Sequence, residues 1–107
     1  MHEIIIYGIQ KLSFNAYNNY HWTKKKKFKD ILIWQVLEAT KLKLKGGYSL
    51  SFEFTFKGKK IDSTNTFHYV KIIEDVIFKE DKDNLHICTI AKQGKENKVK
   101  IIIEKYK

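Results

Sequence analysis

Residues 48–56, YSLSFEFTF, alternate strictly between large apolar side chains and small or polar ones. Because successive side chains of a strand point to opposite faces of a sheet, this pattern predicts a strand with one buried and one polar face. It is the clearest strand signal in the chain, and it indicates a sheet as the centre of the fold. The apolar members are Tyr48, Leu50, Phe52, Phe54 and Phe56.

The flanking segments predict three further strands and two helices. Apolar runs at residues 3–9, 85–91 and 99–106 read as strands, the last two joined as a hairpin by the polar turn KQGKENK. Residues 23–44, with Thr23 as N-cap and Gly46-Gly47 as the stop, and residues 63–78 read as helices. We therefore expect an α/β (α+β) fold in a single domain, residues 1–107, with a mixed sheet and two helices in the order β-α-β-α-β-β.

Each expected helix has one apolar face, with spacings of three and four residues. The side chains expected to be buried are Phe28, Ile31, Leu32, Gln35, Ala39 and Leu42 in the first helix and Phe67, Val70, Ile73, Val76 and Ile77 in the second.

Residues 10–22 are too irregular for a helix and read as an aromatic loop, which either crosses a substrate groove or packs on the sheet.

The chain is strongly basic. It carries 21 lysines, no arginine and 12 acidic residues, giving a net charge of +9, which favours a polyanionic partner. Lysine holds phosphate as a point charge, so a nucleic acid would be selected by shape rather than base sequence. A single cysteine, no signal peptide and no long apolar run lead us to expect a cytoplasmic protein with no membrane partner.

Charge is unevenly distributed along the chain. Half of the twelve acids fall within residues 60–83, where they either bind a divalent cation such as Mg²⁺ or only solvate a surface. The lysine run that opens the first helix lies at the positive end of the helix dipole, where cations are unfavourable. It either binds phosphate or is a solvated charge run. The acids are Asp62, Glu74, Asp75, Glu80, Asp81 and Asp83.

The second helix carries a polar stripe. Spacings of four, three and four residues place Thr64, His68, Lys71 and Asp75 on one narrow line. This stripe is either the floor of a polar site, with Asp62 and Asp83 at its two ends, or only an exposed Lys71–Asp75 pair beside unrelated residues.

The order of these residues resembles the RusA family of Holliday-junction resolvases. Family members often read D-x-D-N, then K and D on a helix, then a D-D turn before a strand. Here Asp62-Ser-Thr-Asn65 is followed by Lys71, Asp75 and an acidic turn ending at Asp83, with Ser13-Phe14-Asn15 near the start. The resemblance covers nearly the whole chain. It implies a homodimer that cleaves branched, four-way DNA with Mg²⁺, or with Mn²⁺ in its place.

The resemblance also implies roles for individual residues. Asp62 and Asp83 would hold the metal, Asp75 would be a further ligand or would orient Lys71, and all four residues would be catalytic. Two positions depart from the family pattern, Thr64 and Lys82, where the family has aspartates; Glu80, Asp81 or water could substitute. The residues expected to contact DNA are Asn15, Lys24, Lys25, Lys26, Lys27, Lys59, Lys60, Asn65 and Lys71.

Three hypotheses follow. The first is a Mg²⁺-dependent endodeoxyribonuclease that resolves four-way DNA junctions. The second is a DNA-binding relative without catalysis, its metal site degraded by Thr64. The third is a small basic interaction module whose acids only solvate its surface.

Overall fold

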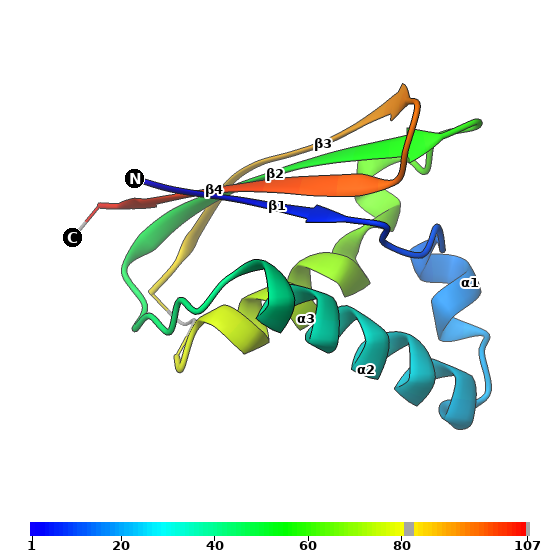
Figure 1. The fold of residues 1–107 in the computed structure, drawn as a ribbon, viewed down its shortest axis with the longest axis horizontal. Helices are drawn as coiled ribbons and strands as arrows, with labels where there is room; N and C mark the ends of the chain where they lie inside the picture. Colours follow the sequence, from blue (N-terminus) through cyan, green and yellow to red (C-terminus); the bar gives the residue numbers. More distant parts are fainter. Residues whose placement is uncertain (81–82, 107) are drawn as a thin grey trace.

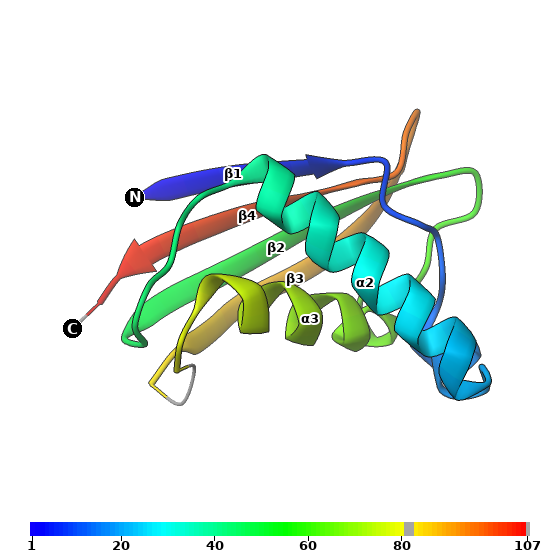
Figure 2. The same ribbon diagram turned by 60° about the horizontal axis from the view of Figure 1, so that its bottom comes forward.

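A computed structural model describes residues 1–80 and 83–106. In it, a four-stranded mixed sheet forms one layer and the two long helices form a second layer on one face of that sheet (Figures 1 and 2). The structure confirms one compact α+β domain with a mixed sheet, but it has three α-helices where two were expected. The elements are β1 (His2–Tyr7), α1 (Phe14–Asn18), α2 (Trp22–Ala39), β2 (Tyr48–Lys57), the 3₁₀ turn η1 (Ser63–Asn65), α3 (Phe67–Ile77), β3 (Leu85–Gly94) and β4 (Lys98–Lys105).

The strand order in the sheet is β1-β4-β2-β3, so the expected hairpin of the last two strands is wrong. β2 lies between them, parallel to β3 and antiparallel to β4. Residues 95–97 connect β3 to β4 by crossing over the end of β2, and Asn97 stabilises this connection with two hydrogen bonds. Its side-chain oxygen accepts from the Lys57 N–H at 2.8 Å, and its carbonyl accepts from the Gly8 N–H at 2.9 Å.

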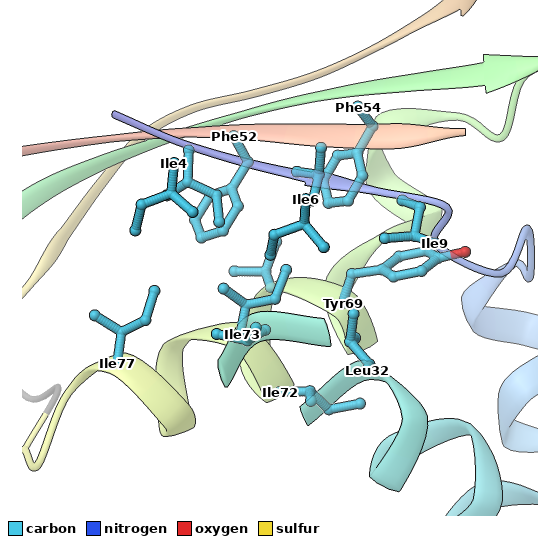
Figure 3. Close-up of a cluster of buried hydrophobic side chains, with 14 of the residues drawn as sticks. Ile4, Ile6, Ile9, Leu32, Phe52, Phe54, Tyr69, Ile72, Ile73 and Ile77 are labelled. Carbon is cyan, nitrogen blue, oxygen red and sulfur yellow. The ribbon is translucent and has the colours of Figure 1, made fainter. Parts of the chain in front are cut away.

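The alternation of β2 is confirmed. Leu50, Phe52, Phe54 and Phe56 are buried on the face that the helices cover. Side chains of β1 and β4 join them, and α3 closes the core from below with Tyr69, Ile73 and Ile77 (Figure 3). The opposite face of the sheet carries the polar positions of β2.

The first long helix differs from its prediction at both ends. α2 begins at Trp22 with His21 as N-cap, whose ring Nδ1 accepts from the Thr23 N–H, so Thr23 is not the cap. It ends at Ala39 rather than at the glycines, because the backbone is extended at Thr40 and Leu44 pairs with Phe78 in a parallel bridge. Its buried side chains are Phe28, Leu32 and Val36, whereas Ile31, Ala39 and the half-buried Gln35 and Leu42 lie nearer the surface.

The other two helices also correct the expectation. Residues 14–18 form the short helix α1, capped by Ser13, whose hydroxyl accepts from the Ala16 N–H at 3.1 Å. The second expected helix is divided into η1 and α3. In α3, Val70, Ile73 and Ile77 are buried as expected, whereas Val76 is half-buried and Phe67 is exposed.

Candidate nucleic-acid interface

The first half of α2 carries a concentrated positive charge. Residues 22–30 hold five lysines against one aspartate, Asp30, which leaves a net charge of +4. Asp30 pairs with Lys26 at 2.8 Å. No carboxylate in the described part of the chain forms an ion pair with the other four, which we call the lysine cluster: Lys24, Lys25, Lys27 and Lys29.

Lysines on the open face of the sheet have a different environment. Lys92 pairs with Glu53, and Lys100 lies 3.8 Å from Glu3. The hydrogen bond from Lys92 lowers the pKa of Glu53. Lys98 likewise lies 3.4 Å from Glu96. Three lysines of this face are therefore countered by glutamates, whereas residues 22–30 of α2 keep a net charge of +4.

Aromatic rings lie under the lysine cluster. The Lys24 ammonium lies 5.3 Å from the ring centre of Tyr20, and that of Lys25 lies 5.5 Å from the ring of Tyr17. Cations over ring faces are favoured by the ring quadrupole. These contacts offset the unfavourable position of the lysines at the positive end of the helix dipole.

A hollow of about 190 Å³ opens where α1, α2 and α3 meet. We call it the aromatic hollow. It brings together three of the four residues of the predicted stripe, with aromatic side chains of α1 and one lysine of the cluster. Thr64 lies outside it, in η1. The lining residues are Phe14, Tyr17, Lys29, Phe67, His68, Lys71, Ile72 and Asp75.

His68 lies at the buried side of the hollow. Only 3% of its surface is exposed, and the rings of Phe14, Tyr17 and Phe28 surround it with centroids 5.1–5.8 Å away. Burial lowers the pKa of His68 to about 4, although its hydrogen bond to the Leu12 carbonyl opposes this shift. The neutral ring donates from Nε2 to that carbonyl at 2.7 Å. The predicted stripe implied that His68 is an exposed polar residue. The structure shows instead that it is an uncharged part of the packing.

Lys71 and Asp75 form the expected pair one helical turn apart. Their charged atoms are 3.4 Å apart, and both side chains are about half exposed. An exposed pair of this kind contributes little to stability. Its position on the rim of the hollow, beside Lys29, places two lysines and one carboxylate around the opening.

The three predicted metal ligands do not come together within one chain. Asp62 precedes η1 and Asp83 follows the end of α3, and the 11 residues of α3 alone span about 16 Å. Among residues 1–80 and 83–106, no group of three or more histidine, cysteine, aspartate or glutamate side chains could hold a metal ion. Two predicted positions, Asp81 and Lys82, lie outside the described residues.

The remaining predicted DNA contacts divide between two places. Asn15 lies exposed on α1, next to the aromatic hollow, and Asn65 is half-buried in η1. Lys59 and Lys60 lie exposed in the turn after β2. This turn, α1 and the start of α2 lie at the same end of the molecule (Figures 1 and 2).

Sequence reasoning missed a polar cluster between α3 and β3. Glu74 is only 3% exposed, and its two carboxylate oxygens accept from His86 at 2.8 Å and from the Asn84 amide at 3.0 Å. The Asn84 oxygen accepts in turn from the backbone N–H groups of Gly47 and Tyr48. The cluster ties α3 to the start of two strands. The sequence did contain a signal for this cluster. Glu74 lies four residues after Val70 and three before Ile77, which places it on the buried face of α3.

Comparisons with known proteins assign no family. No family model, curated protein or solved structure matches this chain. In the described part of the chain, no helix combines the length and apolar character that crossing a membrane requires.

Proposed function

We propose that the protein binds nucleic acid through backbone phosphates, with branched DNA as its partner, and that the lysine cluster makes the main contact. The proposal rests on four lysines close together on α2 that form no ion pair with a described carboxylate, whereas Lys92, Lys98 and Lys100 on the sheet each lie within 4 Å of a glutamate. Such a surface attracts a polyanion, and phosphate contact releases the counterions of the nucleic acid.

The chemistry of the cluster supports recognition of shape rather than sequence. Lysine offers a compact point charge, whereas bidentate reading of guanine is most often done with arginine, which this chain lacks. The basic turn with Lys59 and Lys60 lies at the same end of the molecule as the start of α2. Two basic segments at one end suit a partner whose phosphates lie on more than one arm.

A charge-matched pair of variants tests this proposal. In the first, the lysine cluster is replaced by glutamine; in the second, four lysines outside the site, Lys92, Lys98, Lys100 and Lys105, are replaced in the same way. Both lose four charges. We expect the first variant to bind a labelled four-way junction at least about ten-fold more weakly than the wild-type protein at low salt. The second variant should lose much less affinity. Equal weakening by both variants would show that net charge alone is responsible and would contradict the proposed site.

A second candidate function is Mg²⁺-dependent cleavage of the junction by a homodimer. The Lys71–Asp75 pair on the rim of the hollow favours it, because a lysine there could offset charge on a scissile phosphate. Within one chain Asp62 and Asp83 lie beyond opposite ends of α3, so a metal site that used both would need a second copy of the chain. Mg²⁺ or Mn²⁺ at such a site would activate water for phosphodiester hydrolysis.

Incubation of a labelled junction with Mg²⁺, Mn²⁺ or chelator separates the hypotheses. Symmetric nicking that disappears with chelator and in Asp62→Asn supports the nuclease. Tight binding without nicking in either metal supports a DNA-binding relative without catalysis. Absence of binding leaves a small basic interaction module. Molar mass by light scattering, with and without junction, tests the homodimer.

A further inference from the structure

We propose that the aromatic hollow binds an unpaired nucleobase of the nucleic acid that the lysine cluster holds. This inference rests on the proposed function and adds to it a preference for strands with unpaired bases. Every base has a flat face that stacks on aromatic side chains, and binding of single strands combines such stacking with a positively charged groove. The hollow has both features.

Phe67 is the residue most available for stacking. It opens the first turn of α3, and 58% of its surface is exposed, although it lies on a strongly apolar helix. Its ring meets that of Phe14 edge to face, with centroids 5.9 Å apart and an angle of 76° between the planes. In an edge-to-face pair, the ring that presents its edge has neither of its faces covered by the partner, and the other ring has only one face covered. Whichever role Phe67 takes, at least one face of its ring is therefore not covered by Phe14. A base could stack on that face.

The opposite side of the hollow is formed by packed aromatic side chains. Tyr17 stacks on His68 at 5.1 Å, and His68 is held by its hydrogen bond to the Leu12 carbonyl. His68 is buried and neutral, so the floor has no charge that would oppose an uncharged base. A preformed aromatic site loses little conformational freedom when a ligand enters it.

Charge at the rim complements the phosphates on either side of a bound base. Lys29 and Lys71 line the opening, and Asp75 counters only one of these charges. Lys25, over the ring of Tyr17, continues the positive surface toward the rest of the lysine cluster. A base in the hollow therefore leaves its flanking phosphates beside lysines. A neutral apolar peptide segment would not use these charges, and we favour the nucleotide for that reason.

The test is stacking measured on Phe67 variants. We would titrate the protein into a single-stranded oligonucleotide containing 2-aminopurine, whose fluorescence falls when the base stacks, and into a fully paired duplex of the same length. Phe67→Ala should weaken binding of the single strand by roughly ten-fold and abolish the fluorescence change, with duplex affinity unchanged within about two-fold. Phe67→Trp should restore both.

Tyr7→Ala is the matched control, because Tyr7 is an aromatic residue of nearly the same exposure, 57% against 58% for Phe67, on the edge strand β1. It should leave both affinities unchanged. Thermal unfolding of each variant establishes that it is folded.

Two outcomes overturn the inference and are distinguishable. If the wild-type protein binds both nucleic acids and Phe67→Ala weakens them equally or not at all, the base site is wrong and the proposed function stands. If the wild-type protein binds neither, both proposals fail together.

Discussion

The buried, neutral His68 predicts a loss of stability in mild acid. Its pKa is lowered to about 4 in the folded protein, against 6.5 when unfolded. Between these values the unfolded chain binds the proton and the folded chain does not, so the free energy of unfolding falls as pH decreases. Stability is complete above about pH 6.5 and is lost progressively down to about pH 4.

The magnitude follows from the pKa difference. Each pKa unit corresponds to about 1.4 kcal/mol, so a shift of about 2.5 units contributes about 3 kcal/mol, of which about 2 kcal/mol is lost between pH 7 and pH 5. This is a large part of the 5–15 kcal/mol that is typical of a folded domain. The charged residues nearest to His68 on the hollow, Lys29, Lys71 and Asp75, lie at the rim.

Urea unfolding at pH 7, 6 and 5, for wild type and His68→Phe, measures the effect. The variant keeps an aromatic ring but leaves the Leu12 carbonyl without its donor, which costs about 1–3 kcal/mol at every pH. The carboxylates titrate in both proteins and cancel in the difference. We therefore expect the free energy of unfolding of the wild-type protein, relative to that of the variant, to fall by about 2 kcal/mol from pH 7 to pH 5.

His68→Gln, which can still donate to that carbonyl, provides a second variant if the first does not fold. A difference in the free energy of unfolding that stays constant with pH would refute the argument, because His68 would then titrate alike in the folded and unfolded chains.

Three further changes test the packing, each by urea unfolding at pH 7. Ile73→Ala should lower the free energy of unfolding by about 2–5 kcal/mol, because Ile73 is fully buried between α3 and the sheet. Ile31→Ala, at a position 41% exposed, should lower it clearly less, and equal losses would contradict the assigned core. Gly94→Ala should destabilise by about 1–3 kcal/mol because its new carbon would lie 2.3 Å from the Thr55 methyl, and Thr55→Ser, which removes that methyl, should restore most of the loss. Tyr69→Phe should cost about 1–3 kcal/mol because the buried hydroxyl accepts one backbone hydrogen bond and donates another, and an unchanged stability would show that these bonds do not form.

The fold could be predicted from the sequence where one pattern dominated. β2 was correct almost to the residue because its alternation has only one structural interpretation. The end of α2 was not predicted although a signal existed: the stretch KLKLK, residues 41–45, alternates with period two, and Leu44 within it pairs with Phe78 in a parallel bridge. The glycines that follow it predict a helix stop more strongly than this short alternation predicts an earlier end.

Other elements had no sufficient local signal. α1 has five residues, too few to show a helical period, and only the Ser13 cap indicates it. The hairpin prediction failed because residues 95–97 have a length that suits a tight turn as well as a crossing past β2. Which strand pairs with which is set by the whole sheet, and the apolar residues of β3 carry no mark of their partner.

The candidate site was partly predictable. Helical spacing alone placed Lys71 and Asp75 together, and the lysine run was visible as charge at the wrong end of a helix. The aromatic hollow was not predictable, because Phe14 and Phe67 are 53 residues apart in the chain and meet only through the packing of α1 on α3. The burial of His68 has the same origin, since rings from α1 and α2 cover it.

The most direct test of the central claim, that the lysine cluster binds nucleic-acid phosphates, is the affinity for a labelled four-way junction measured between 50 and 300 mM salt. We predict that the logarithm of the binding constant falls linearly with the logarithm of salt concentration, with a slope of about −3 or steeper. Replacing the lysine cluster with glutamine should make that slope shallower by about 3. A slope near zero in the wild-type protein, or an unchanged slope after the replacement, would contradict the claim.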